Sequence, residues 1–507
     1  MSPSVASGIS VRALVAALLT ACVGATDAQG SAQGPASAAS VRVEVNAAAA
    51  HQVMEGFGAT TLSLVYGNGA NDKLPPSLRA RALKAVYGDV RLTLGNVDIG
   101  VFEPANDDAD PFYLNQSAFE LAGLQAVADK LVTPAKALAG ESLSLYPGNS
   151  VSLTAATWLE PIRKADYNRY LDESAEYVVA AVLKWRDATG DIPRYHALFN
   201  EPTIGNVELK GGGAQEMIDI IKRAGARLRA VGMPTKFIAP SEYSVLSATT
   251  LARAILADPG ARQYVAAIGY HVYPYGSPYS STTRILEGPG RGRRDETEIA
   301  QRRALRDLGR QYNLPLWMTE VSHGGVDPRT MDALRARAIA IHDELAYTDA
   351  SAYFGMLSMW DSETNTEHSG PSQSLFKEED TIALIDLPTS SVFITGMGYA
   401  IGHYARWVQR GAMRVESSSS DSLVLVSAFT DNRRGKASVV IINNGDVPKS
   451  VRVHLNGLAF TGPLTGEQSH EDVRWRPLGA VTLEGTTRDA FVLTVPARSV
   501  TSVGGTY

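Results

Sequence analysis

The sequence predicts an α/β protein: a (β/α)8 TIM barrel followed by a C-terminal antiparallel β-sandwich side domain. From about Val53 to Tyr404, strand-like runs alternate with amphipathic helical stretches, which is the pattern of a parallel sheet covered by helices. After Tyr404 the helical spacing stops, and short alternating runs separated by turn residues follow. The length of 507 residues, 45% of them hydrophobic and 20% charged, fits a large barrel with one accessory domain.

Eight short apolar or β-branched runs are predicted to form the barrel strands. They are Val53–Ala59, Val90–Gly95, Ser142–Tyr146, Tyr195–Phe199, Lys236–Ala239, Ala266–Tyr270, Leu316–Thr319 and Ser351–Ser358. The helices expected between them include Asp166–Thr189, Ala214–Val231, Glu296–Tyr312 and Arg329–Tyr347. Within Ala214–Val231, apolar residues recur at helical spacing, and we interpret this stripe as core packing. Its members are Met217, Ile220, Ile221, Ala224 and Leu228.

The C-terminal region carries short strand signals with turns between them. The expected strands are Ser422–Phe429, Ala437–Asn443, Val451–Leu455 and Phe491–Val495. The early run Val41–Val45 alternates as well, and we expect it to return and pair with this C-terminal sheet. The predicted organisation is therefore a strand of the side domain at 41–48, a catalytic barrel over 49–403 and a β-sandwich over 404–507.

The N-terminus has the features of an export signal, predicted over residues 1–28 and followed by a flexible linker over 29–40. Arg12 precedes the apolar run Ala13–Leu19, which is too short to span a bilayer. The formal net charge of −6 gives no indication of a polyanionic partner, so no nucleic-acid binding is expected.

The only cysteine of the chain is Cys22, in the order Leu19-Thr20-Ala21-Cys22, which resembles the lipobox of bacterial lipoproteins. Two alternatives stay open: lipidation at Cys22, or plain secretion after cleavage at a small residue such as Ala25 or Ala28. Both predict an exported bacterial protein that is secreted, periplasmic or at the cell surface. A membrane is expected as a partner only through this lipid anchor, and neither alternative leaves a disulfide.

Two segments end in a glutamate directly after an apolar run: Phe199-Asn200-Glu201-Pro202 and Trp317-Met318-Thr319-Glu320. In a barrel the active site lies at the C-terminal ends of the strands, so Glu201 and Glu320 are expected to face one cleft. Two such carboxylates can share the acid and nucleophile roles at a glycosidic bond. A single glutamate at the end of a strand is more often an ordinary surface residue, but the pair of glutamates indicates a catalytic role.

Five segments together resemble one known family: Met54-Glu55-Gly56-Phe57-Gly58-Ala59, Asn200-Glu201-Pro202, Thr319-Glu320, Gly402–Gly411 and Pro496–Val500. That family is glycoside hydrolase family 30, in clan A, and the likeness extends from about Val41 to Val503. The resemblance implies a retaining β-glycosidase on a barrel, with a β-sandwich made from both chain ends. It also implies that Glu201 is the general acid/base and Glu320 the nucleophile in double displacement on a β-linked glycan or glycoconjugate.

The resemblance implies supporting roles for further residues. Asn200 would hydrogen-bond the 2-hydroxyl of the sugar, with a simple turn residue as the alternative. Arg91 matches a family arginine that keeps the nucleophile charged, although it could also pair with another carboxylate. Tyr273 is placed to hydrogen-bond Glu320.

Other candidates are less specific. Trp360, just past the eighth strand, offers a flat apolar face for a sugar ring, with core packing as the alternative. His271 is a candidate substrate-binding residue, although a hydrogen-bonded cleft or core histidine is the simpler interpretation. Asp98 and Glu242 are strand-end carboxylates that could bind sugar hydroxyls. The nine histidines show no metal-ligand spacing, and no Rossmann or P-loop pattern occurs, so no metal and no cofactor is predicted.

One segment departs from the family pattern. Ser144-Leu145-Tyr146-Pro147-Gly148 stands where family members carry a Ser-Pro-Trp-Ser-Pro-Pro-like segment that lines the sugar subsite. Glucosylceramide, β-1,6-glucan, xylan and β-galactan therefore all stay open as substrates. Two alternatives also remain: an exo-acting β-xylosidase or β-glucosidase of the same clan, and a non-catalytic carbohydrate-binding surface lipoprotein. The presence of both glutamates argues against the non-catalytic alternative.

Overall fold

The chain divides into two units, Met1–Ala38 and Ala39–Tyr507. The computed structural model describes residues 40–61, 74–99, 122–148, 150–204, 208–273, 285–286, 296–321, 326–361 and 381–507. All of these residues lie in the second unit. The predicted signal segment with Cys22, and nearly all of the linker predicted over 29–40, therefore lie outside the described residues. None of the described helices combines the length and the apolar composition that crossing a bilayer requires.

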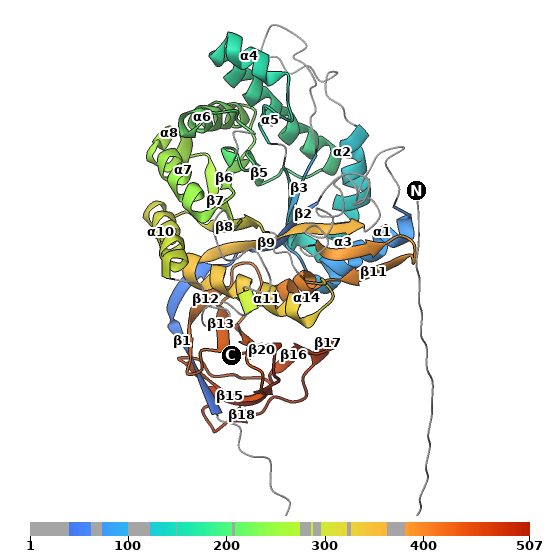
Figure 1. Ribbon diagram of the computed structural model, residues 1–507, viewed down its shortest axis with the longest axis vertical. Coiled ribbons are helices and arrows are strands. Elements are labelled where there is room, and N and C mark those ends of the chain that lie inside the picture. Colours follow the sequence, from blue (N-terminus) through green and yellow to red (C-terminus); the bar gives the residue numbers. More distant parts are fainter. Residues whose placement is uncertain are drawn as a thin grey trace, which may run out of the picture. The chain divides into compact units, whose positions relative to one another are not determined.

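Eight parallel strands form the barrel, in the order β4-β3-β2-β9-β8-β7-β6-β5 (Figure 1). They are β2 (Gly56–Thr61), β3 (Leu94–Val97), β4 (Ser144–Pro147), β5 (Tyr195–Ala197), β6 (Lys236–Glu242), β7 (Val265–His271), β8 (Leu316–Glu320) and β9 (Ala350–Asp361). Across the seam between β4 and β5, Val151 donates its N–H to the carbonyl of Leu198 at 2.9 Å. The rings of Tyr146 and Tyr195 also meet edge-on there, 5.9 Å apart. The predicted barrel is confirmed.

Helices and helical turns connect these strands. They are α1 (Pro76–Leu83), η3 (Lys84–Val90), α2 (Ala122–Val127), η4 (Ala128–Val132), α3 (Thr133–Ala139), η5 (Gly140–Ser142), α4 (Leu159–Ala165), α5 (Tyr167–Thr189), α6 (Ala214–Ala230), α7 (Val245–Ala257), α8 (Pro259–Arg262), α10 (Glu296–Tyr312), α11 (Met331–Asp343), η8 (Glu344–Thr348) and α14 (Gly396–Ala405). Local signals set the bounds of α5: the Asp166 side chain accepts the N–H of Arg169, and Gly190 ends the helix in the left-handed conformation.

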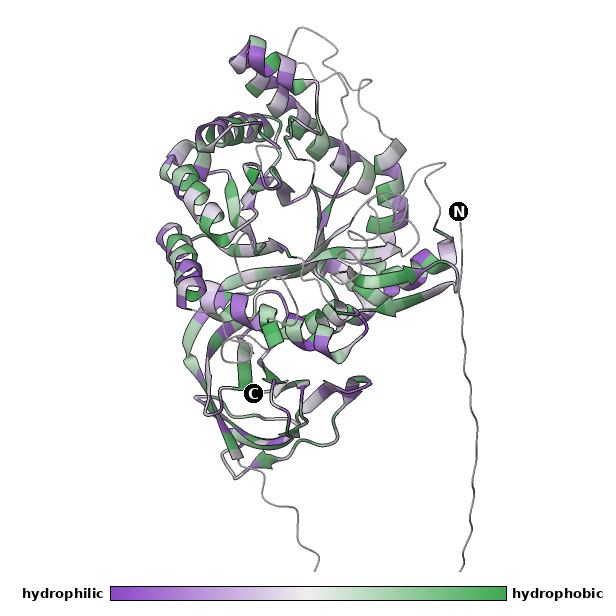
Figure 2. Cartoon of the chain, viewed as in Figure 1, coloured by the Kyte–Doolittle hydropathy of each residue, from purple (hydrophilic) through white to green (hydrophobic). Residues whose placement is uncertain are grey.

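The core follows the hydrophobic pattern of the sequence. All five residues of the stripe predicted in α6 are buried, and the helices around the barrel carry both hydrophobic and hydrophilic residues (Figure 2). Inside the barrel, Trp317 stacks on Phe354 with ring centroids 6.0 Å apart. Leu94 and Ile238 pack in the same buried cluster. Because side chains fill the barrel, a ligand has room only at its ends.

Strands at both ends of the chain form the second sheet, in the order β17-β16-β20-β14-β13-β12-β1-β15-β19-β18. They are β1 (Ser40–Val53), β12 (Met413–Ser419), β13 (Val424–Asp431), β14 (Lys436–Asn443), β15 (Lys449–Asn456), β16 (Thr465–His470), β17 (Val473–Pro477), β18 (Leu483–Glu484), β19 (Ala490–Val495) and β20 (Ser499–Thr506). As predicted, the first strand returns to this sheet, with β12 and β15 as neighbours. The pairing of β1 with β15 is parallel, so the sheet is mostly rather than entirely antiparallel.

Buried polar contacts join the barrel helix α14 to this sheet. The ring nitrogens of His403 lie 2.9 Å from Ser502 Oγ and 2.8 Å from Ser469 Oγ. Burial lowers the pKa of His403 to about 3, so the ring is neutral and bridges the two hydroxyls as donor and acceptor. Arg406 forms an ion pair with Glu467 at 3.0 Å. The sequence-based domain boundary at Tyr404 falls inside α14, and these contacts tie the two parts together.

Candidate active site

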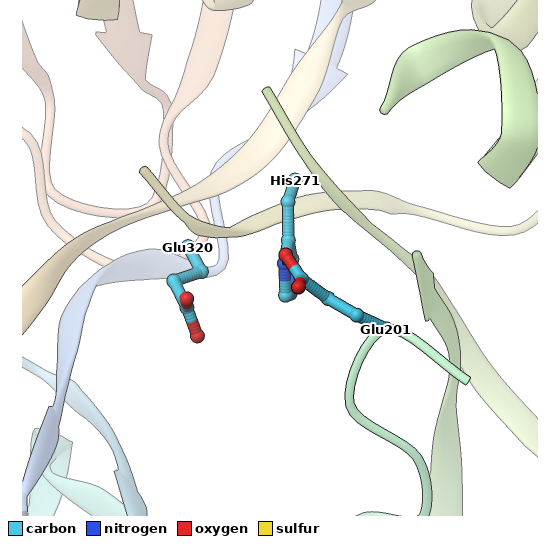
Figure 3. A group of neighbouring side chains, drawn as sticks. All are labelled: Glu201, His271 and Glu320. Carbon is cyan, nitrogen blue, oxygen red and sulfur yellow. The ribbon is translucent and has the colours of Figure 1, made fainter. Parts of the chain in front are cut away.

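Three ionisable side chains meet at the C-terminal end of the barrel. Glu320 is the last residue of β8, His271 is the last residue of β7, and Glu201 lies in the turn after β5. One ligand atom from each side chain lies within 4.8 Å of the other two. Figure 3 shows that the three side chains approach one another from different parts of the barrel rim. The fold thus brings together the two glutamates that the sequence predicted to face each other.

Each glutamate has a fixed partner. His271 Nδ1 lies 2.9 Å from Glu201 Oε1, and the His271 side chain is only 2% exposed. The phenol of Tyr273 donates to Glu320 Oε1 at 2.7 Å, so the contact predicted from the sequence is present. These contacts hold both carboxyl groups in orientations that face the cleft. A reaction on a molecule bound between the two groups requires this orientation.

Three carboxyl groups surround His271. Burial lowers the pKa of His271, but the charges of Glu320, Glu201 and Glu242 and the hydrogen bond to Glu201 outweigh it and raise this pKa above its usual value. The imidazole therefore favours its protonated form more than a histidine in water does. In that form it donates a hydrogen bond to Glu201 and partly balances the negative charge of the site.

A pocket of about 410 Å³ opens at this end of the barrel. Its lining consists of Thr60, Asn96, Asp98, Tyr146, Gly148, Ser150, Ser152, Ala155, Tyr177, Ala197, Phe199, Asn200, Glu208, Ile238, Ser241, His271, Thr319 and Glu320. Aromatic rings and hydroxyl, amide and carboxyl groups share this surface, which fits a ligand with both apolar faces and many hydroxyls. No lysine or arginine occurs among these described lining residues.

The other predicted substrate contacts have different outcomes. Asn200 and Asp98 line the pocket, Asn200 with an exposed side chain. Trp360 is half-buried near the C-terminal end of β9, and it is not part of the described lining. Because residues 362–380 lie outside the described residues, its contact with a sugar stays a prediction. Glu242 is fully buried and accepts the N–H and hydroxyl of Thr203, so it supports the turn after β5 instead of facing the pocket.

The prediction for Arg91 is wrong. Lys84–Val90 form the helical segment η3, and Arg91 follows it in the left-handed conformation with φ of 68°. The strand therefore begins only at Leu94. Arg91 is exposed at the N-terminal side of β3, whereas Glu320 lies at the C-terminal end of β8. In this position Arg91 cannot hold Glu320 in its charged form.

Sequence reasoning missed one carboxyl group of the site. Glu208 lines the pocket, is only 5% exposed and accepts the backbone N–H of Asn200 at 2.8 Å. It lies between β5 and α6, in a stretch rich in glycine without hydrophobic periodicity. The only available signal was its position seven residues after Glu201, which is too weak to single out a residue.

The three converging side chains also have the donor types that a divalent cation prefers. Within the described part of the chain, the group of side chains that could hold a metal ion consists of Glu201, His271 and Glu320. The hydrogen bonds of His271 and Tyr273 already use one atom of each carboxylate.

Comparisons with known proteins agree with this architecture. Residues 411–503 match the model of the glycosyl hydrolase family 30 beta sandwich domain. A GH30 endoxylanase from Clostridium papyrosolvens has a TM-score of 0.61 at 18% identity, covering 92% of this chain and 100% of that chain. The catalytic domain of GH30 xylanase C from Talaromyces cellulolyticus has a TM-score of 0.66 at 17% identity, with coverage of 92% and 100%. The endo-beta1,6-glucanase BT3312 has a TM-score of 0.62 at 20% identity, with coverage of 92% and 93%. No curated protein matches the chain in a sequence comparison.

The fold is a (β/α)8 barrel with a β-sandwich side domain, and these solved structures share it. The resemblance to glycoside hydrolase family 30 is confirmed for the sandwich, which matches that family's own domain model over residues 411–503. Solved structures of that family share the fold over 92% of the chain. The identities of 17–20% to these structures show the fold and leave the substrate undefined.

Proposed function

We propose that the protein is a retaining β-glycoside hydrolase that cleaves a β-linked glycan or glycoconjugate by double displacement. One observation carries this proposal: the side chains of Glu201 and Glu320 converge at the rim of the barrel, with one carboxylate oxygen of each no more than 4.8 Å from the other. Retaining enzymes hold their two carboxyl groups about 5–5.5 Å apart, whereas inverting enzymes leave about 6.5–9.5 Å for a water molecule. The short separation therefore favours retention.

The proposed roles follow from the chemistry of the two steps. In the first step an oxygen of Glu320 attacks the anomeric carbon, and Glu201 donates its proton to the glycosidic oxygen as the C–O bond breaks. This step leaves a glycosyl ester on Glu320. In the second step Glu201 removes a proton from water, the water oxygen attacks the anomeric carbon, and the ester bond to Glu320 breaks.

The surroundings of the glutamates support this division of roles. The hydrogen bond from Tyr273 holds the carboxyl group of Glu320 in the cleft, where a nucleophile is needed. The contact with His271 holds Glu201 toward the cleft. Asn200 directly precedes Glu201 and lines the pocket, where its amide is available to a sugar hydroxyl.

A screen with aryl β-glycosides and polysaccharides, with product sizing, tests the activity and its endo or exo mode. NMR of the first product gives the anomeric configuration, and an inverted product would refute the retaining assignment. Binding of a glycan without any turnover would favour the non-catalytic alternative.

Two substitutions test the roles. Both Glu201→Gln and Glu320→Gln should abolish the hydrolysis of natural substrates. For Glu201→Gln, the missing acid–base help alone should lower the rate by about 10²–10⁴-fold. On a nitrophenyl glycoside, whose leaving group needs no proton, Glu201→Gln should still form the glycosyl-enzyme, and azide should accelerate its breakdown. Glu320→Gln should fail on every substrate. The opposite pattern would reverse the two roles.

We also propose that the protein is exported and that Cys22 becomes a lipidated N-terminus. The support is the lipobox-like order around Cys22, the only cysteine of the chain. Expression in a bacterium with a labelled fatty acid should label the wild type and leave Cys22→Ser unlabelled. Soluble, label-free protein whose mature N-terminus lies beyond Cys22 would contradict lipidation and favour plain secretion.

A further inference from the structure

The turn that carries Glu201 is held by hydrogen bonds to its backbone. The N–H of Asn200 donates to Glu208 Oε2 at 2.8 Å, and the N–H of Glu201 donates to the carbonyl of Ser241 at 2.9 Å. Two residues further on, the N–H and hydroxyl of Thr203 donate to Glu242 Oε2 at 3.1 and 2.8 Å. Two buried carboxyl groups thus hold the turn, one on each side of Glu201.

Glu201 itself has a φ of 49°, in the left-handed region. A residue with a side chain is unfavourable in this region, and it persists where surrounding contacts impose it. Losing the contact at Asn200 would free the peptide between Phe199 and Asn200, one residue before Glu201. A small rotation there moves the carboxyl group at the end of the glutamate side chain by a larger distance, away from the cleft.

The backbone at Glu208 has one anchor outside the turn and one to Pro202 within it. The carbonyl of Glu208 accepts the N–H of Leu153, in the segment after β4, at 2.8 Å. The next residue, Leu209, is fully buried and donates its N–H to the carbonyl of Pro202 at 3.3 Å. The carboxyl group of Glu208 is therefore a fixed acceptor, and it can impose a position on the peptide that it binds.

We propose that Glu208 is a positioning residue: by accepting the N–H of Asn200 it fixes the turn that directs Glu201 toward Glu320. The inference rests on the proposed acid/base role of Glu201. Glu208 acts through the backbone of its neighbour, and no contact with the reacting atoms is required of it.

The charge state of Glu208 fits this role. Burial raises the pKa of Glu208 well above its usual range, and the charges of Glu242 and Glu201 raise it further. The N–H of Asn200 and the hydroxyl of Ser150 act in the opposite direction without cancelling the effect of burial. A protonated Glu208 still accepts a hydrogen bond through its second oxygen. In this form it adds no negative charge beside Glu201, whose proton the first step of the reaction needs.

Glutamine reproduces a protonated glutamate in size, lack of charge and acceptor oxygen, whereas methionine has similar length and lacks the acceptor. Glu208→Gln and Glu208→Met are therefore a matched pair of variants. Glu298→Met is the control, since it removes another buried carboxyl group from α10, far along the chain from the turn. The readout is kcat/KM, which reports the first step, on aryl β-glycosides with leaving groups of increasing acidity.

Glu208→Met should lower kcat/KM by about 10- to 100-fold on substrates with poor leaving groups, which need the proton of Glu201. It should remain within about 3-fold of the wild type on a dinitrophenyl glycoside, which needs no proton. Glu208→Gln and Glu298→Met should keep the leaving-group dependence of the wild type. If Glu208→Met lowers kcat/KM equally on all leaving groups, Glu208 contacts the substrate or the variant is generally damaged, and the proposal is refuted. If kcat/KM is unchanged on every leaving group, the proposal is also refuted.

If Glu208→Met folds poorly, the thermal unfolding and the activity of Glu208→Gln test the proposal instead. The raised pKa of Glu208 favours its protonated form in the folded state, so the wild type loses stability as pH rises above the unfolded pKa of the carboxyl group. Glu208→Gln has no proton to lose, and it should therefore unfold at a higher temperature than the wild type at pH 8 but not at pH 4. A large drop in kcat/KM for Glu208→Gln on every substrate would show that an ionised carboxylate is needed, contrary to the proposal.

The two proposals fail in different ways. If the wild type hydrolyses no glycoside, or if Glu201→Gln retains full activity on poor leaving groups, the proposed function itself is wrong. If the wild type is active and Glu201→Gln is impaired on those substrates, a uniform response of Glu208→Met refutes the positioning role alone.

Discussion

Removing the first strand should unfold the side domain, although this strand lies more than 350 residues before the other strands of its sheet. In β1, Val41, Val43 and Val45 are 4%, 0% and 1% exposed. Burying one valine contributes about 1.5–3 kcal/mol, so the three side chains together contribute about 5–9 kcal/mol. The whole stability of a domain is about 5–15 kcal/mol. Deleting residues 1–46 should therefore remove most of it, expose the edge of β15 that β1 covers, and leave β12 with only its pairings to Ala50 and Val53 on that side.

The matched control is deletion of residues 1–38, which removes the first unit and leaves β1 in place. Purified proteins are compared by solubility, by cooperative thermal unfolding and by activity on an aryl glycoside. We expect the 39–507 protein to behave as the full chain does and the 47–507 protein to aggregate. A soluble 47–507 protein whose unfolding midpoint lies within about 2 °C of the control would refute the reasoning, because a loss of several kcal/mol shifts the midpoint by considerably more.

Three further predictions concern the site and the side domain. His271→Asn should be less stable than the wild type by an amount that is largest below pH 6.5 and shrinks as pH rises through the raised pKa of His271; urea unfolding at pH 5.5 and 9 measures this, and a difference that grows with pH would contradict the assignment. EDTA should leave glycoside hydrolysis unchanged and added Zn²⁺ should inhibit it, because Glu201, His271 and Glu320 could chelate the ion; a loss with EDTA that metal restores would indicate a metal-dependent enzyme instead. Deleting residues 404–507 should give insoluble protein, since it removes Ser469 and Ser502 from buried His403, whereas a soluble, fully active 1–403 protein would show that the barrel folds alone.

The parts of the fold that depend on hydrophobic periodicity could be predicted from the sequence. The bounds of α10 are as predicted, and α6 ends one residue earlier than expected. The positions of Glu201 and Glu320 could be predicted because each follows an apolar run and because strands of a barrel share one direction. Once the strands are assigned, their C-terminal ends must lie on the same rim.

The remaining features depend on contacts between distant residues, which one sequence does not display. The strands β16 and β18 are short and carry many polar residues, so no alternation marks them. The hairpin of β10 (Thr381–Asp386) and β11 (Ser391–Ile394) extends the barrel sheet beside β9 and has no counterpart in the predicted set of eight strands. Arg91 was misplaced because the left-handed turn before β3 has no glycine or asparagine to indicate it.

The segments that suggested the family serve two different purposes. Asn200 and Glu201 belong to the proposed catalytic site, whereas Gly56 and Gly58 serve packing. Gly56 has a φ of 143°, which side chains rarely adopt, and a Cβ on Gly58 would lie 2.6 Å from the ring of Phe354.

The chain around these glycines joins the barrel to the side domain. The N–H of Met54 donates to the carbonyl of Ala412 at 2.7 Å, and the N–H of Gly411 donates to the carbonyl of Met54 at 2.8 Å. This segment therefore fixes the point where the chain leaves the sandwich strand β1 and enters the barrel. Its similarity to the family consequently supports the architecture, whereas the case for hydrolysis depends on the separate geometry of Glu201, His271 and Glu320.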